Sequence, residues 1–82
     1  MTRSVFLTAY EAFRSSLIDA RKASGKSQVE LAQLLNRPQS FVSKVESGDR
    51  RLDVVEFVEI CRALNADPYA TIQAIDEALR TP

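Results

Sequence analysis

Four polar side chains in one short segment have the types and spacing needed to read the edges of DNA bases. Residues 38–48 have the sequence PQSFVSKVESG, and a helix there would turn by about 100° per residue. Within about 140° of that wheel lie Gln39, Ser43, Ser40 and Lys44. Gln can pair with N6 and N7 of adenine, Lys can donate to O6 and N7 of guanine, and Ser adapts to several bases. These side chains suit a helix lying in a major groove.

The opposite arc of the same wheel is apolar. Val45 falls near about 240° and Val42 near about 300°, so both should face the rest of the protein. Phe41 falls near about 200°, between the two arcs. We expect its ring to be partly packed, with one edge towards DNA, because apolar groups contact the thymine methyl. Gly48 should end the helix.

A helix of this kind needs a second helix to hold it. Residues 28–35 form a candidate. They are joined to the helix within 38–48 by only three residues, 36–38, so the two are the second and third predicted helices of the chain. Two short helices with so tight a turn form a helix-turn-helix, here at about residues 27–47. Asn36 is among the better non-glycine residues for a left-handed turn, and Ala32 is small where the helices cross. The residues expected to fill the space between the helices are Leu31, Leu35, Val42 and Val45.

The remaining elements are also predicted to be helices, which makes the fold all-α. Thr8 with Glu11, and Ser27 with Glu30, each form a capping box, and Asp53 with Glu56 follows the same logic. Asp67-Pro68 places a proline in a first turn, where it is tolerated. The predicted helices are 9–23, 28–35, the segment within 38–48, 54–64 and 68–79. Their expected inward-facing residues outside the helix-turn-helix are Phe13, Leu17, Ala20, Val54, Phe57, Val58, Cys61, Leu64, Ile72, Ile75 and Leu79.

Length and composition limit the possible classes of protein. The chain has 82 residues, one cysteine and no histidine, so we expect one domain over residues 1–82, without an internal disulfide, a metal site or enzymatic activity. No apolar run approaches the roughly 18–20 residues of a membrane span, and the first residues make a poor secretory signal. The expected location is cytoplasmic. Cys61 is interpreted as a core thiol and not as a redox switch.

Charge is unevenly distributed although the net charge is zero. Residues 14–51 hold eight basic against four acidic residues, whereas residues 52–82 hold two basic against six acidic. A basic face with an acidic rear fits a polyanionic partner; an ordinary mixed, solvated surface is the alternative. Glu56 and Glu59 are interpreted as part of a solvated acidic face.

The segment SQVELAQLLNRPQSFVSKVESGDRRLDVVEFVEICRALNADP resembles the lambda-repressor-like, Cro/Xre family of helix-turn-helix proteins. The resemblance covers about residues 13–79. It is carried by SQxELA, by V-x-x-V-E-x-G at the end of the third helix, and by a following capped helix that ends in A-L-N. It implies a compact five-helix DNA-binding domain.

The resemblance also implies roles for particular residues. Gln28 would contact a phosphate, and Gln39 would match a glutamine that reads a base, with Ser40, Ser43 and Lys44 near base edges. The residues expected on the DNA backbone are Gln28, Lys26, Arg37, Arg50 and Arg51; the last two could instead pair with Asp49 and Asp53. Glu46 matches a structural position, with Arg21 as a candidate partner. Pro38 replaces the usual Ser or Thr, so a capping hydroxyl is missing.

As a function, the resemblance implies a transcriptional regulator, most simply a repressor, that binds double-stranded DNA as a homodimer without a cofactor or a small-molecule ligand. The dimer surface is either the last helix (Tyr69, Ile72, Ile75, Leu79) or the N-terminal Val5, Phe6 and Leu7. The rival interpretation is a protein-interaction adaptor or an antitoxin-type module that binds a protein partner.

Overall fold

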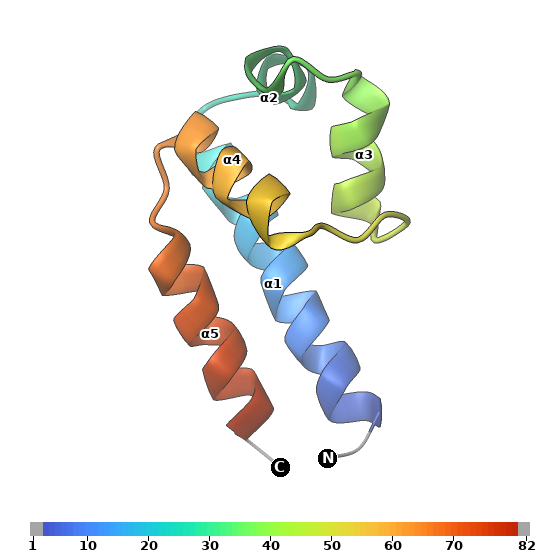
Figure 1. The fold of residues 1–82 in the computed structure, drawn as a ribbon, viewed down its shortest axis with the longest axis vertical. Helices are drawn as coiled ribbons and strands as arrows, with labels where there is room; N and C mark the ends of the chain where they lie inside the picture. Colours follow the sequence, from blue (N-terminus) through green and yellow to red (C-terminus); the bar gives the residue numbers. More distant parts are fainter. Residues whose placement is uncertain (1–2, 81–82) are drawn as a thin grey trace.

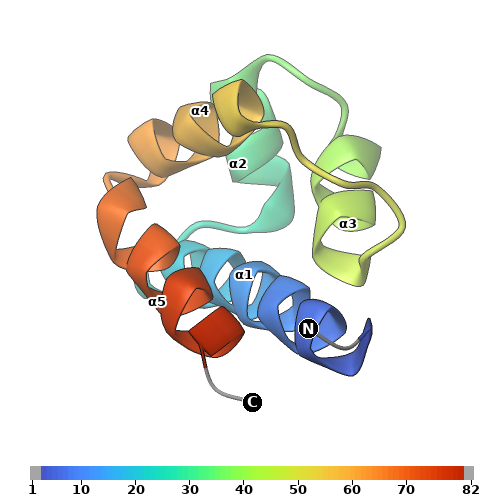
Figure 2. The same ribbon diagram turned by 60° about the horizontal axis from the view of Figure 1, so that its bottom comes forward.

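A computed structural model of the chain describes the backbone of residues 3–80 and the side chains of residues 8–80. Within that range the protein is all-α, as predicted. The first and last helices lie side by side, and α3 stands on the other side of α1 from α5 (Figures 1 and 2). No helix of the described part is both long and apolar enough to cross a membrane. The helices are α1 (Arg3–Ala23), α2 (Gln28–Leu35), α3 (Gln39–Ser47), α4 (Val54–Leu64) and α5 (Pro68–Arg80).

Local sequence signals fix most helix ends. Ser27 and Asp53 form the two predicted capping boxes at the starts of α2 and α4. Asn36 ends α2 with φ 56°, and Gly48 ends α3 with φ 90°, both in the left-handed region. Pro38 is the N-cap of α3 and provides no side-chain hydrogen bond, so the loss of a capping hydroxyl is confirmed.

The predicted start of the first helix is wrong. Helix α1 begins at Arg3 and not at Ala9, so Thr8 lies inside the helix and not at its N-cap. Between Arg3 and Ala23 there is no glycine or proline to stop the helix, and α1 packs along α5. Tertiary packing therefore stabilises helical turns that precede the Thr8 capping signal. The side chains of Val5, Phe6 and Leu7 lie outside the described residues.

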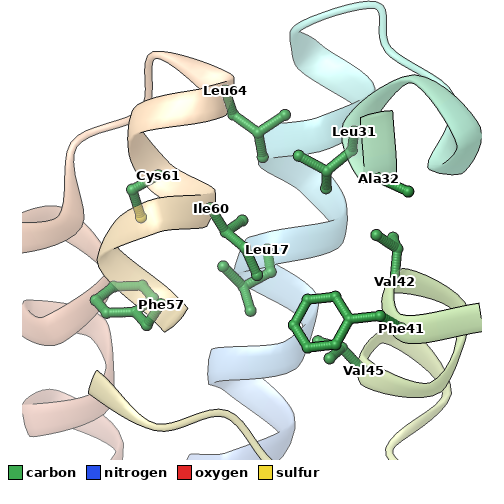
Figure 3. Close-up of a cluster of buried hydrophobic side chains, with 10 residues drawn as sticks. All are labelled: Leu17, Leu31, Ala32, Phe41, Val42, Val45, Phe57, Ile60, Cys61 and Leu64. Atoms are coloured by element: carbon green, nitrogen blue, oxygen red, sulfur yellow. The ribbon is translucent and has the colours of Figure 1, made fainter. Parts of the chain in front are cut away.

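The core lies where α1, α2, α3 and α4 meet (Figure 3). Leu17 comes from α1, Leu31 and Ala32 from α2, and Val42 and Val45 from α3. All five are buried as predicted, and Cys61 of α4 is buried with them. Burial raises the pKa of the Cys61 thiol, which favours the neutral form of a core side chain.

The expected inward faces of α4 and α5 are partly wrong. Val54 is 75% exposed, whereas Ile60 is buried in its place, and Ile72 is 51% exposed. Val54 and Ile72 line an apolar groove of about 310 Å³ between α1, α4 and α5. The groove exists because α5 packs chiefly on α1 and touches α4 much less, so their facing apolar residues do not close on each other.

Candidate nucleic-acid interface

Helix α3 presents the predicted polar residues on its outer side. Gln39, Ser40 and Lys44 are exposed and Ser43 is half-buried, while Val42 and Val45 point into the core. Lys44 forms no ion pair with any described residue. The inner residues thus fix the rotation of α3, and an amide, two hydroxyls and an ammonium group remain on the accessible side.

A chain of hydrogen bonds from the interior of the fold ends on Gln39. Arg21 of α1 donates twice to the carboxylate of Glu46, over 2.7 Å from Nε to Oε2 and 3.0 Å from Nη2 to Oε1. Gln28 Nε2 donates to Glu46 Oε1 over 3.0 Å. Gln39 Nε2 in turn donates to Gln28 Oε1 over 2.9 Å. The predicted partnership of Arg21 with Glu46 is confirmed.

This series of hydrogen bonds fixes which way each glutamine amide points. Ionised Glu46 can only accept hydrogen bonds, so Gln28 must turn its NH₂ group towards it. Gln28 then offers its oxygen to Gln39, which must turn its own NH₂ group inwards. Gln39 keeps one N–H and its whole carbonyl oxygen for a ligand. One donor beside one acceptor is the pattern that pairs with N7 and N6 of adenine.

Arg21 and Glu46, where this series of hydrogen bonds begins, favour their charged forms. Burial raises the pKa of Glu46, but hydrogen bonds from Arg21 and Gln28 outweigh it and hold the pKa below its ordinary value. The hydrogen bond to Glu46 raises the pKa of Arg21. Arg14 adds a hydrogen bond to the main-chain oxygen of Glu46, at the C-terminal end of α3. Arg14 was not predicted; its spacing of seven residues from Arg21 on one helix face was the available signal.

Phe41 belongs to the core. Its ring is 8% exposed and points towards Leu17 (Figure 3), so the expected half-packed ring is wrong. The guanidinium carbons of Arg37 and Arg50 lie 4.4 Å and 4.8 Å from the ring centroid. These two side chains cover the Phe41 ring, which the helical wheel places between the polar and the apolar arc.

Glu56 is likewise not part of a solvated face. The residue is 8% exposed, and Arg50 donates to both of its carboxylate oxygens over 2.9 Å. Arg37 approaches Glu56 Oε2 to 3.3 Å. The hydrogen bond from Arg50 is the main cause that lowers the pKa of Glu56 to about 2. Arg50 thus pairs with Glu56 and not with Asp49 or Asp53; Glu59 is exposed, as expected.

The other predicted backbone residues are placed individually. Lys26 is half-buried, and its main-chain oxygen accepts a hydrogen bond from Arg21 Nη1 over 2.9 Å. Arg51 is exposed, with its guanidinium carbon 4.3 Å from the ring centroid of Tyr10. The structure therefore joins Gln28, Gln39 and Glu46 into one hydrogen-bonded unit, and it gathers Arg37 and Arg50 at a separate one.

Comparison with known proteins gives a consistent result. The model of a helix-turn-helix family matches residues 17–70. A solved XRE-family-like protein from Pseudomonas syringae pv. tomato str. DC3000 is 45% identical, covers 98% of this chain and 95% of its own, and has a TM-score of 0.87. The clp gene regulator ClgR from C. glutamicum is 20% identical, covers 90% and 96%, and has a TM-score of 0.75; this shows a shared fold. Curated proteins gave no match.

Proposed function

This chain belongs to the Xre family of helix-turn-helix DNA-binding transcriptional regulators, and from that premise we propose that it represses transcription by inserting α3 into the major groove of a specific DNA site. Gln39, Ser40, Ser43 and Lys44 read bases in this proposal. Gln28, Lys26, Arg37 and Arg51 contact phosphates and set the register of the helix. We propose a cytoplasmic location with it, because a DNA-binding regulator works in the compartment that holds its DNA.

The observation that carries the proposal is the oriented amide of Gln39. A surface glutamine normally samples many rotamers, and ordering it costs free energy on binding. Here Gln28 holds Gln39 in place before any ligand arrives, over 2.9 Å. The remaining donor and acceptor of Gln39 match adenine, so an A·T pair is the expected target opposite this residue.

The decisive experiment is selection of bound duplexes from a random DNA pool, followed by titration against salt. The logarithm of the affinity should fall steeply as the logarithm of salt rises, and Arg37→Ala should lessen that slope by about one phosphate. Lys44→Ala should relax preference at one base pair and cost about 1–3 kcal/mol. A wild-type protein that binds no duplex at low salt would refute the function.

We also propose that the protein binds DNA as a homodimer through α5. One module reads few base pairs, and two-fold dimers reading half-sites about one DNA turn apart are the common solution. Ile72, Ile75 and Leu79 of α5 line the apolar groove, and Tyr69 beside them is 78% exposed. This supports the α5 option of the two predicted surfaces. Sedimentation of wild type and Ile72→Asp should give a dimer and a monomer.

The same groove favours one second candidate, a module that binds a protein partner. An apolar groove is also what an adaptor or antitoxin-type module would offer to another protein. The two candidates differ in what the outer side of α3 is for. An adaptor would bind its partner undisturbed after Gln39→Ala, whereas a DNA reader would lose preference for its selected site.

A further inference from the structure

One carboxylate gathers the residues on both sides of α3. Arg37 precedes the helix and Arg50 follows it, yet both reach Glu56 in the first turn of α4. The same carboxylate also accepts the main-chain N–H of Asp53 over 3.1 Å, which closes the capping box of α4. Glu56 is therefore fixed within α4 by the capping box, and it binds Arg37 and Arg50 on the two sides of α3.

The ring of Phe41 completes this cluster. Phe41 stands in the first turn of α3, and the guanidinium groups of Arg37 and Arg50 both lie over its ring at cation–π distance. Arg50 is also fixed through its main chain, because its N–H donates to Lys44 O at the end of α3 over 3.1 Å. Side chain and backbone of Arg50 thus act on the same helix.

The position of α3 in the fold leaves it with few supports on the side of α4. The helix stands at the edge of the molecule and is joined to α4 by the loop of residues 48–53 (Figure 1). Val42 and Val45 pack its inner face into the core, and Glu46 near its C-terminal end pairs with Arg21 of α1. On the side of α4, the charged cluster at Glu56 provides the corresponding support.

We propose that Glu56 is a positioning residue for α3: acting through Arg37 and Arg50, it sets the angle of the helix and thereby the ability to discriminate between DNA sequences. The inference rests on the proposed DNA-binding function. Arg50 is assigned to holding the loop and not to a phosphate, because three of its five N–H groups already donate to Glu56 and to Arg51 O. Arg37, at 3.3 Å and 4.0 Å from its two carboxylates, remains able to turn to a phosphate.

Two variants and one matched control test the proposal. Glu56→Gln removes the charge but keeps a side chain that suits a capping box. Arg50→Lys keeps the charge but loses the bidentate geometry. Glu59→Gln is the control, since Glu59 lies one turn away, is exposed, and approaches Arg37 only to 4.0 Å. For each protein, the dissociation constants for the selected duplex and for a scrambled duplex are measured at one salt concentration, together with hydrogen exchange of the α3 amides without DNA.

Discrimination is the dissociation constant for the scrambled duplex divided by that for the selected duplex. In Glu56→Gln and Arg50→Lys this ratio should fall about tenfold or more, as expected for a weakened charged hydrogen bond. Partial unfolding weakens both duplexes equally and leaves this ratio unchanged. Exchange of the α3 amides should rise at least about tenfold in both variants, with little change in Glu59→Gln.

The two hypotheses fail separately. Unchanged α3 exchange in Glu56→Gln, or an unchanged ratio in a wild type that does discriminate, overturns the role of Glu56. A wild type that binds neither duplex overturns the DNA-binding function, and with it the effect on discrimination. Raised α3 exchange in that case would still support Glu56 as the residue that positions α3.

Discussion

Replacing Arg21 with Met should remove a large part of the stability of this domain. The change leaves the carboxylate of Glu46 in place with Gln28 as its remaining side-chain donor. Removing one partner of a buried ion pair costs about 3–5 kcal/mol. Because the two side chains retain 12% and 10% exposure, we expect a value near the lower limit, about 3 kcal/mol. A domain of 82 residues has a total stability of about 4–12 kcal/mol.

Chemical denaturation followed by circular dichroism measures this loss, and the same change should lower Tm by about 10–25 °C. A double-mutant cycle with Glu46→Gln separates the pair from other effects. The double variant should be about 2 kcal/mol more stable than the sum of the single losses predicts, because it leaves no unpaired charge. Arg80→Ala is the control, since its pair with Asp76 is 75% and 56% exposed and should be worth under about 1 kcal/mol. A loss below about 1 kcal/mol in Arg21→Met, or strict additivity, would refute the reasoning.

Three further predictions concern stability and reactivity. Since the folded pKa of Glu56 is about 2, below its ordinary 4.5, its stabilisation is complete above about pH 4.5 and is lost as pH falls through about 2; urea unfolding at several acidic pH values should show a shallower decline in Glu56→Gln. Asn36 has φ 56°, so Asn36→Val should cost about 1–2 kcal/mol in thermal unfolding while Asn36→Gly should be neutral or stabilising; similar losses in both would contradict this. Cys61 is buried, so a thiol reagent such as DTNB should modify it only at the rate of unfolding, and prompt reaction in the native protein would contradict its burial.

Much of this architecture could be predicted from local signals. Ser27, Asn36 and Gly48 act through the backbone next to them, so their effects are readable in the sequence. The period of Val42 and Val45 likewise fixed the inner face of α3 in advance. Thr8 shows the limit of such signals, because a capping pattern was overridden by packing of α1 along α5.

The residue types of the candidate site were predictable, but apart from Arg21 with Glu46 their partners were not. The helical wheel placed Gln39 and Lys44 on the outer side of α3, and the family resemblance implied DNA contacts for Gln28 and Gln39. Neither could show that Gln28 bridges Gln39 to Glu46, since both hydrogen bonds join α2 to α3. Phe41 was ambiguous because one helix cannot reveal what covers its edge.

The sequence by itself determined an all-α helix-turn-helix protein and the residues that its third helix exposes, because helix periodicity and capping are local properties of the chain. Beyond the pair of Arg21 with Glu46, only the tertiary structure decided how the charges pair. Arg37 precedes α3 and Arg50 follows it, and they meet at Glu56 because the loop after α3 leads into the first turn of α4. Glu56, expected on a solvated face, is thus buried beside two arginines. A carboxylate leaves water at low cost only where opposite charges and hydrogen-bond donors replace it.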